Sequence, residues 1–301
     1  MLDSIRGFAA LIAAVGITVT LASFYGGAHD AFDTFAAFRV QLAIGFAGLL
    51  VFALVFSAMT ARYLSLIGLV IATAGLTPAL MGREPVAVAD MRAYSQNLRY
   101  DNPTPDRVAR AIRATEADIV MLQEVSESNR VILDGFAREF PTRVLCDFSR
   151  VGGVAILSRY RMIGEPGCAR GQGITWARLR TPQGPVTAVS IHLPWPWPYG
   201  TQARQSERVA GMLAELEEPI VIAGDFNNAA WSHAVGRLRL ATGTRATPGL
   251  RLTLQRQMLW PGLPLDHALV SEDLVAESRM LELFGSDHRA LLTELRWRGG
   301  A

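Results

Sequence analysis

Three long uncharged runs fill the first 82 residues, and they constrain the fold of this 301-residue chain more than any other feature. The runs cover residues 7–28, 40–61 and 63–82, and none of them contains Asp, Glu, Lys or Arg. A membrane-spanning helix needs about 20 mostly apolar residues, which each run supplies. Buried core helices are the alternative, but a soluble helix of this length normally keeps a polar face. We therefore predict a transmembrane region over residues 1–82 that is built from three spans.

Charges at the ends of these runs predict the orientation of the region. Arg6 precedes the first run, and Arg62 lies in the turn between the second and the third. The loop between the first two runs has Asp30 and Asp33 against a single Arg39. Cytoplasmic loops are enriched in Lys and Arg, so the N-terminus and the Arg62 turn are expected inside. Three spans then place the rest of the chain on the outer, periplasmic face of the inner cell membrane. A signal peptide in place of the first span is the remaining alternative.

The rest of the chain is predicted to be a connector, residues 83–92, and a domain over residues 93–301. Short apolar segments typical of strands alternate there with segments whose apolar residues have helical spacing. Thr104 and Pro105 form a favoured helix start. The pattern predicts a mixed α/β fold whose sheets are covered by helices. Strands are expected at 93–99, 118–124, 153–158, 184–192, 219–224, 265–271 and 288–297, and helices at 104–116 and 202–217.

The chain contains two cysteines, Cys146 and Cys168, both in the predicted soluble part. Neither belongs to a metal-binding C-x-x-C pair. In an oxidising compartment they could form a disulfide, and the predicted outer location favours this over two unrelated thiols.

Polar side chains follow the expected strands at the points where the strands end. Loops at strand ends on a rigid sheet commonly hold catalytic groups. The set contains two amides, four carboxylates and two imidazoles, and such hard oxygen ligands suit Mg²⁺ or Mn²⁺ better than zinc. The less specific alternative is that Asp225 caps a helix and Asn227 fills a turn. The members of the set are Asn97, Glu124, His192, Asp225, Asn227, Asp266, Asp287 and His288.

Six segments around these residues resemble the endonuclease/exonuclease/phosphatase superfamily in order and spacing. The resemblance extends over about residues 94–295 and is greatest to bacterial members with N-terminal membrane spans. It implies a four-layer α/β sandwich, with two packed mixed sheets flanked by helices, preceded here by a bundle of three transmembrane helices. The segments are NLRY at Asn97, DIVMLQEV at Glu124, SIHLP at His192, GDFN at 224–227, LDHALVS at Asp266 and GSDHRAL at Asp287.

The resemblance also implies a role for each polar residue. Glu124 would be the principal ligand of Mg²⁺ or Mn²⁺, helped by Asn97 and Asp287. Phosphoryl transfer needs charge neutralisation, an in-line nucleophile and donors around the phosphoryl oxygens.

The remaining five residues would act on the water and the phosphate. Asp225 would orient or deprotonate the attacking water, and Asn227 would donate a hydrogen bond to a phosphoryl oxygen. His288 would contact the phosphate in a tautomer fixed by Asp266. His192 would be a second imidazole aimed at the phosphate or the leaving oxygen.

Together these features predict a membrane-anchored, metal-dependent phosphoric ester hydrolase that cleaves a phosphodiester or phosphomonoester, with lipid-linked substrates included. The superfamily contains deoxyribonucleases, abasic-site endonucleases, neutral sphingomyelinases and inositol-polyphosphate 5-phosphatases. A nuclease acting on DNA or RNA is one alternative, although the net charge of +2 lacks the strong basic character of a dedicated nucleic-acid binder. An inactive, membrane-tethered binding module is the second, and the intact set of polar residues opposes it.

Two further segments bear on the substrate. The loop from Pro194 to Tyr199 has three aromatic residues directly after His192. Trp and Tyr favour the lipid headgroup region, so we expect a substrate presented at the membrane surface; packing over the sheet edge is the alternative. The stretch TLQRQ at 253–257 departs from related proteins, which often have an aromatic residue after the Thr. This difference leaves the substrate contacts open.

Overall fold

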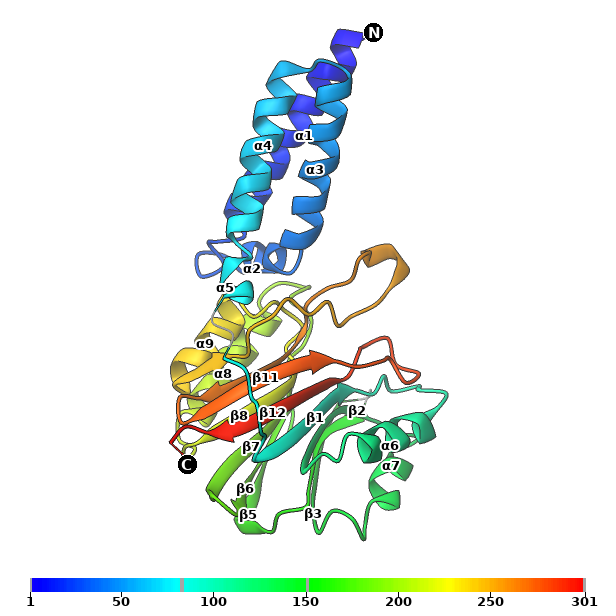
Figure 1. Cartoon of the computed structure of the whole chain (residues 1–301), viewed down its shortest axis with the longest axis vertical. Helices are drawn as coiled ribbons and strands as arrows, with labels where there is room; N and C mark the ends of the chain where they lie inside the picture. Colours follow the sequence, from blue (N-terminus) through cyan, green and yellow to red (C-terminus); the bar gives the residue numbers. More distant parts are fainter. Residues whose placement is uncertain (1, 82–83, 150–151, 300–301) are drawn as a thin grey trace.

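The computed structural model describes residues 2–81, 84–149 and 152–299. Figure 1 shows a bundle of helices standing on an α/β domain, with the first helix beginning at the end of the bundle farthest from the domain. The helices are α1 (Leu2–Ala22), α2 (Asp30–Ala36), α3 (Arg39–Val55), α4 (Met59–Ala74), α5 (Thr77–Leu80), α6 (Pro105–Ala114), α7 (Arg130–Gly135), α8 (Thr201–Leu213), α9 (His233–Ala241) and the 3-10 helix η1 (Gln257–Leu259). The strands are β1 (Met91–Asn97), β2 (Ile119–Val125), β3 (Thr142–Ser149), β4 (Gly152–Ser158), β5 (Met162–Ala169), β6 (Ile174–Thr181), β7 (Gly184–His192), β8 (Ile220–Asp225), β9 (Thr244–Ala246), β10 (Asp266–Ser271), β11 (Leu274–Met280) and β12 (Leu291–Trp297).

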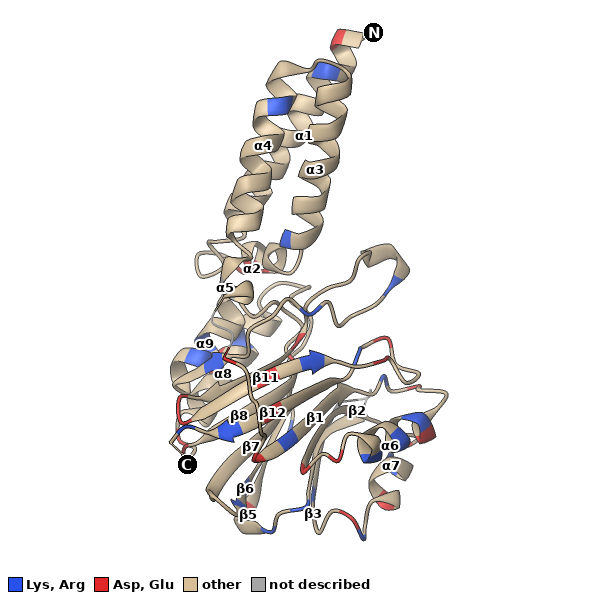
Figure 2. Ribbon diagram, in the orientation of Figure 1, with Lys and Arg blue, Asp and Glu red and all other residues tan. Residues whose placement is uncertain are grey.

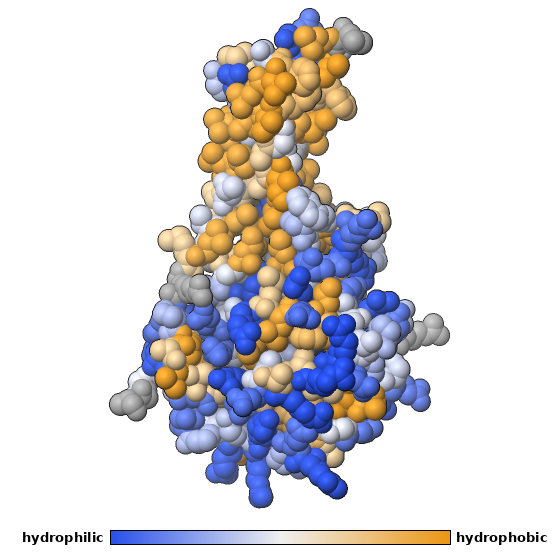
Figure 3. All heavy atoms as spheres, turned by 45° about the vertical axis from the view of Figure 1, so that its right-hand side comes forward, coloured by the Kyte–Doolittle hydropathy of each residue, from blue (hydrophilic) through white to orange (hydrophobic). Residues whose placement is uncertain are grey.

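The bundle consists of α1, α3 and α4, and α4 packs against both of the others. Figure 2 shows its charged residues near its two ends, and Figure 3 shows apolar surface along its length. Small residues let neighbouring helices approach closely, and the buried ones include Ala9, Ala13, Ala53, Ala61 and Ala72. Large apolar side chains face outward, and those more than half exposed include Phe8, Leu11, Val51, Val55 and Val70.

The helices of the bundle are shorter than the predicted spans. Among the described residues, one helix, the 21-residue α1, is long and apolar enough to cross a membrane by itself. The pair α2 and α3 would add a second crossing only if both formed one span, and they meet at a bend of 66°. Helix α4 has 16 residues and is below that length. The prediction of three full-length transmembrane helices is therefore not met.

The predicted spans were too long because a lack of charge does not by itself specify a helix. Residues 23–29 form turns around the pair Gly26–Gly27, and residues 56–58 form the turn between α3 and α4. The predicted boundary between residues 82 and 83 lies outside the described residues. Strand β1 begins at Met91, so the end of the predicted connector is already part of the sheet.

The domain is built from two mixed six-stranded sheets with the orders β11-β12-β1-β2-β4-β3 and β5-β6-β7-β8-β10-β9. Apolar side chains such as Met121, Ile156 and Val221 fill the space between the sheets. Helices α6 and α7 cover the outer face of the first sheet, where Ile112 packs. Helices α8 and α9 cover the second, where Val209 packs. These layers form the four-layer α/β sandwich that the sequence predicts.

Strand pairing brings the ends of four strands to one edge of the sandwich. Strands β1 and β2 run parallel, and Asn97 lies opposite Gln123. Strands β7 and β8 also run parallel, and His192 lies opposite Asp225. Strand β10 pairs antiparallel to β8, so its first residue, Asp266, also lies opposite Asp225. Polar residues that are up to 169 positions apart in the sequence therefore meet at this edge.

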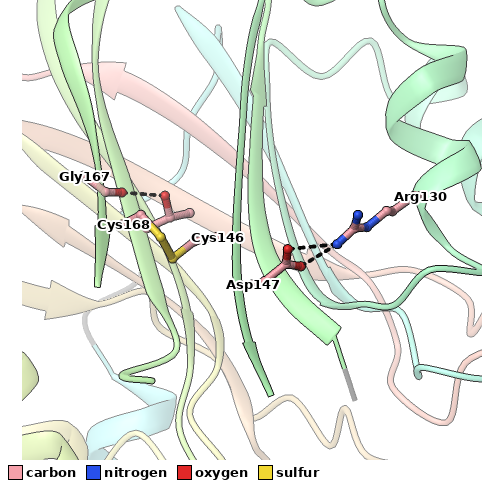
Figure 4. Close-up of a disulfide and its surroundings, with 6 residues drawn as sticks. Arg130, Cys146, Asp147, Gly167 and Cys168 are labelled. Carbon is pink, nitrogen blue, oxygen red and sulfur yellow. Dashed lines mark hydrogen bonds and ion pairs between the residues drawn. A yellow bond between two sulfur atoms is a disulfide. The ribbon is translucent and has the colours of Figure 1, made fainter. Parts of the chain in front are cut away.

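Cys146 and Cys168 form a disulfide, with their Cα atoms 5.4 Å apart (Figure 4). Cys146 lies on β3 and Cys168 on β5, which are edge strands of different sheets. The bond therefore joins the two sheets, and the sequence-based pairing of these cysteines is confirmed. Beside it, Arg130 of α7 forms an ion pair with Asp147, with a shortest distance of 2.7 Å.

The segment around α2 attaches the bundle to the domain. The buried Asp33 accepts hydrogen bonds from the backbone nitrogens of His233 (2.6 Å) and Ala234 (2.9 Å), which begin α9. A carboxylate is favoured at a helix N-terminus because the backbone N–H groups there lack partners within the helix. Trp231 donates from its indole nitrogen to the carbonyl oxygen of Ala36 (2.8 Å). These contacts fix the domain against the base of the bundle.

Candidate active site

The strand ends surround a cavity of about 710 Å³, and six of the eight predicted site residues line it. These six are Glu124, His192, Asp225, Asn227, Asp287 and His288. The other two, Asn97 and Asp266, lie behind this lining and hydrogen-bond to it. The structure thus brings all eight residues together.

Asn97 connects the two carboxylates at the centre of the site. Its side-chain nitrogen donates to Glu124 Oε1 (3.1 Å) and to Asp225 Oδ2 (2.9 Å). The other oxygen of Glu124 accepts from the backbone nitrogen of Tyr100 (2.8 Å). Because Asn97 and Asp225 are almost fully buried, these hydrogen bonds are shielded from water and hold the carboxylates in place.

Glu124 enters the cavity through a local irregularity in β2. The register between β2 and β4 shifts between Leu122 and Val125, and Glu124 has a φ of 53°. A residue other than glycine rarely adopts this left-handed conformation, and such positions cluster at functional sites. The bulge turns the carboxylate of Glu124 out of the strand and towards Asn97.

The segment after β8 forms a tight turn. Asp225 Oδ1 accepts from the backbone nitrogen of Asn227 (2.8 Å), and Asn227 has a φ of 49°. Gly224 is required before it because a Cβ there would collide with the carbonyl oxygen of Ile191. Of the less specific alternative, the turn at Asn227 is present, but Asp225 does not cap a helix, because α9 begins at His233 with Ser232 as its N-cap. Asp225 uses only Oδ1 in this turn. Its Oδ2 faces Asn97 and the imidazoles.

Two buried imidazoles, those of His288 and His192, face Asp225 Oδ2. The pKa of the first is raised and that of the second is lowered. His288 Nδ1 is 2.8 Å from Asp266 Oδ2, and His288 Nε2 is 3.8 Å from Asp225 Oδ2. Burial alone would lower the pKa of His288, but the Asp266 and Asp225 carboxylates outweigh it and raise this pKa to about 10. His192 Nε2 is 3.6 Å from Asp225 Oδ2 and 3.9 Å from Glu124 Oε1. Burial and the neighbouring His288 lower the pKa of His192 to about 4.

The oxygen-rich site fits a hard divalent cation. Asp225, Asp266 and His288 each offer one ligand atom, and these atoms lie within 4.8 Å of one another. Among the described residues, Asp266 Oδ1 is buried without a hydrogen-bond partner. The ligand set predicted from the sequence lies at the same cavity, since Glu124 and Asp287 line it and Asn97 hydrogen-bonds to Glu124 from behind the lining. Both sets offer oxygen atoms, which Mg²⁺ and Mn²⁺ prefer.

Arginine side chains at the cavity are the main feature that the sequence did not reveal. Arg256 donates to Asp287 Oδ2 from Nε (2.8 Å) and lies 2.7 Å from it through Nη2. Arg99, with a φ of 60°, also lines the cavity and is paired with Asp101. The motif NLRY contains Arg99, and the unusual stretch TLQRQ contains Arg256. These two motifs were signals for such residues, but the fold alone shows that both arginines reach the site.

His267 lies outside the site, as expected for the residue after Asp266 on a strand. Its ring nitrogen Nε2 donates to the carbonyl oxygen of Asn228 (2.9 Å), and burial lowers its pKa to about 4. In the loop after His192, Trp195 lines the cavity, whereas Trp197 and Tyr199 are 62% and 43% exposed. Tyr199 contacts the ring of His29, so this loop lies at the base of the bundle.

Comparison with known proteins supports these observations. The model of the endonuclease/exonuclease/phosphatase family matches residues 94–288. A comparison with curated proteins gives no match.

Solved structures share the fold of the domain at low sequence identity. An endonuclease/exonuclease/phosphatase from Bacteroides vulgatus has a TM-score of 0.58 and 20% identity, covering 69% of this chain and 99% of its own. A beta toxin mutant from Staphylococcus aureus with bound magnesium ions has a TM-score of 0.53 and 16% identity, covering 68% and 99%. The endonuclease domain of the telomere-specific retrotransposon TRAS1 has a TM-score of 0.54 and 18% identity, covering 69% and 98%.

Proposed function

Because the chain belongs to the endonuclease/exonuclease/phosphatase family, we propose that it is a membrane-held, metal-dependent phosphoesterase. The observation that supports this most is that the side-chain amide of Asn97 donates hydrogen bonds to the carboxylates of both Glu124 and Asp225. Two imidazoles lie beside these carboxylates, and the pKa of His288 is raised whereas that of His192 is lowered. Such a site offers ligands for a cation, a base for water and donors for a phosphate.

In this proposal Glu124 is the principal ligand of a Mg²⁺ or Mn²⁺ ion, and Asn97 and Asp287 assist it. The similar beta toxin has bound magnesium ions, which supports a hard cation in this chain. When bound, the cation would neutralise charge on the phosphoryl oxygens. Arg256 already neutralises Asp287, so this carboxylate can approach an anionic substrate without strong repulsion.

The water is assigned to Asp225. Its Oδ1 accepts from the backbone of Asn227. Its Oδ2 already accepts from Asn97 and would accept the water as a second donor. Burial raises the pKa of Asp225 above that of an ordinary carboxyl group. A general base works best when its pKa is close to the working pH, so this shift suits deprotonation of water near neutral pH.

The phosphate is assigned to three donors. His288 keeps its proton at neutral pH because Asp266 and Asp225 raise its pKa, and it donates from Nε2 to a phosphoryl oxygen. The neutral His192 faces the phosphate or the leaving oxygen. Asn227 donates from the second N–H of its side-chain amide, since the first is bonded to the carbonyl oxygen of Leu193, 2.7 Å away.

We also propose that the three-helix bundle lies in the inner membrane and that the domain lies on the periplasmic side. The bundle has outward-facing apolar side chains and charges only near its ends. Arg6 and Arg62 belong to the end of the bundle opposite the domain, which is the cytoplasmic end by the distribution of positive charge. The Cys146–Cys168 disulfide supports an oxidising compartment around the domain. Trp197 and Tyr199 at the base of the bundle suit the headgroup region.

The test is a panel of phosphodiesters and phosphomonoesters, lipid-linked and soluble, offered to the full chain with Mg²⁺, Mn²⁺ or a chelator. Hydrolysis that requires the metal is expected. Single-stranded and duplex DNA and RNA belong in the same panel, because the TRAS1 domain with this fold is an endonuclease. Turnover of nucleic acid alone would favour the nuclease alternative, and no turnover of any substrate would favour an inactive binding module.

A further inference from the structure

The helix bundle contains an apolar groove between α1 and α3. The groove has a volume of about 290 Å³. Ile12 of α1 lines one side, and Leu42, Gly45 and Leu49 of α3 line the other. Helix α4 packs against both α1 and α3, which contact each other less, and this arrangement leaves the space between them open. Gln41 is the one polar side chain among the lining residues, and it lies at the end nearest the domain.

The lower end of the groove rests on one loop of the domain. Gln41 donates from its side-chain amide to the carbonyl oxygens of Gly262 (2.7 Å) and Leu259 (3.3 Å). Phe38, which precedes α3 and also lines the groove, packs with Leu254 and Leu263 in a small apolar cluster. The apolar surface of the groove is therefore continuous with the loop over residues 254–263.

The same loop forms one wall of the active site. Leu254 pairs with His288 in an isolated antiparallel bridge, and Gln255 donates from its backbone nitrogen to the carbonyl oxygen of Asp287 (2.8 Å). Arg256 reaches the cavity and pairs with Asp287. A single short loop thus has the groove on one side and the catalytic cavity on the other. Figure 1 shows this loop, in orange, between the bundle and the sheets.

We propose that the groove holds a hydrocarbon chain of the substrate, which is a membrane phospholipid whose phosphate lies in the active site. This inference rests on the proposed function. An apolar groove among lipid-facing helices excludes charged occupants but accepts an alkyl chain. Arg99 and Arg256 line the cavity, each paired with a carboxylate, and their remaining N–H groups suit the phosphate of the same lipid. At the tip of the loop, Met258 and Trp260 are 97% and 71% exposed, which suits contact with the membrane surface.

The test fills the groove without touching the catalytic residues. A Cβ added at Gly45 would meet no atom within 4 Å, so Gly45→Leu places a side chain in the groove without a backbone collision. The matched control is Gly48→Leu, three residues later on α3, where a Cβ also has open space and the position does not line the groove. Each full-length protein is placed in nanodiscs and assayed with Mg²⁺ on a long-chain glycerophospholipid and on soluble bis(p-nitrophenyl) phosphate.

We expect Gly45→Leu to lower kcat/KM for the phospholipid by about 10-fold or more, the loss of roughly one or two buried methylene contacts. Its turnover of the soluble ester should remain within about twofold of wild type, which also shows that the variant is folded, and Gly48→Leu should change neither rate. The groove assignment would be overturned if Gly45→Leu lost activity equally on both esters or kept the wild-type rate on the phospholipid. It would also be overturned if wild type hydrolysed the soluble ester alone. Each of these results would leave the phosphoesterase activity itself in place. Failure of wild type on both esters would instead overturn the proposed function.

Discussion

At the scale of single residues, the candidate site gathers eight polar side chains at one edge of the sandwich. Each of its polar residues lies at a strand end or in a loop within a motif. Strand pairing positions Asn97, His192, Asp225 and Asp266, whereas a bulge, a turn and a loop position the others. The arginines were missed because their positions depend on backbone turns. Arg99 has a φ of 60°, and Arg256 reaches the site only because its loop folds back onto Asp287. A sequence pattern of strands and helices contains no information on such irregular segments.

The buried His267 allows a test of whether burial keeps an imidazole neutral in the folded chain. Its pKa is about 4 in the folded chain, against an ordinary 6.5, because burial disfavours the charged ring. The unfolded chain therefore binds a proton at His267 as the pH falls below about 6.5, whereas the folded chain does not until about 4. Stability should fall across this pH window. His267→Gln keeps an N–H donor for Asn228 and should flatten the fall in Tm between pH 7 and pH 4.5. An unchanged slope would mean that the ring of His267 is not held neutral.

At the scale of elements, the predicted strands with continuous apolar runs were found close to their predicted bounds, and β7 has the predicted bounds. The prediction missed elements that lack such a run. Strand β5 is a partly exposed edge strand that contains Gly164, Pro166 and Gly167, so it shows no apolar alternation. The spans in the first 82 residues were too long for the opposite reason, since every uncharged residue was counted as helical although turns interrupt the helices.

The disulfide makes a prediction about the two sheets. Cys146 and Cys168 are 22 residues apart and join edge strands of different sheets. Closing a loop of this length stabilises a folded chain by about 3 kcal/mol. The double variant Cys146→Ser/Cys168→Ser should lose that much free energy of unfolding in urea titrations. A reducing agent should lower the stability of wild type by the same amount and leave the double variant unchanged; equal stability of wild type with and without reductant would mean that the bond does not form.

The attachment of α2 to α9 makes a second prediction at this scale. Asp33 accepts two backbone hydrogen bonds at the start of α9 and lies 3.3 Å from the amide nitrogen of Asn228, one residue after Asn227. Asp33→Ala should therefore lower the free energy of unfolding by about 1–2 kcal/mol and also reduce turnover. Asp30→Ala is the matched control, because the Asp30 side chain makes no hydrogen bond with any residue that the structure describes. Equal behaviour of the two variants would show that the bundle does not support the domain through Asp33.

At the scale of the whole molecule, the four-layer sandwich followed from the family motifs, whereas the placement of the bundle over the site did not. No pattern in the sequence links residues 37–41 to the loop at 254–263. They meet through side-chain contacts such as those of Gln41 with Gly262 and Leu259. Such contacts depend on the finished fold, so only the structure shows that the candidate active-site cavity lies beside the base of the helix bundle.

The orientation of the chain is tested by a reporter fused after residue 301. The proposed orientation puts the end of the bundle with Arg6 and Arg62 in the cytoplasm, so a periplasm-dependent reporter such as an alkaline phosphatase should be active. A cytoplasm-dependent fluorescent reporter at the same position should be dark. The reverse result would place the domain in the cytoplasm and remove the oxidising environment that the disulfide requires.

The most direct measurement is metal-dependent turnover by matched glutamate variants. Glu124 lies in the cavity and is held by Asn97, whereas Glu127, three residues later, is exposed and outside it. With Mg²⁺ and the phosphoester that wild type hydrolyses fastest, Glu124→Gln should lower kcat by about 100-fold or more, because removing one electrostatic participant typically costs this much. Glu127→Gln should keep the wild-type rate, and a chelator should abolish activity in both wild type and Glu127→Gln. A Glu124→Gln protein that hydrolyses the ester at the wild-type rate, or a wild-type rate that persists in chelator, would contradict a metal-dependent phosphoesterase built on Glu124.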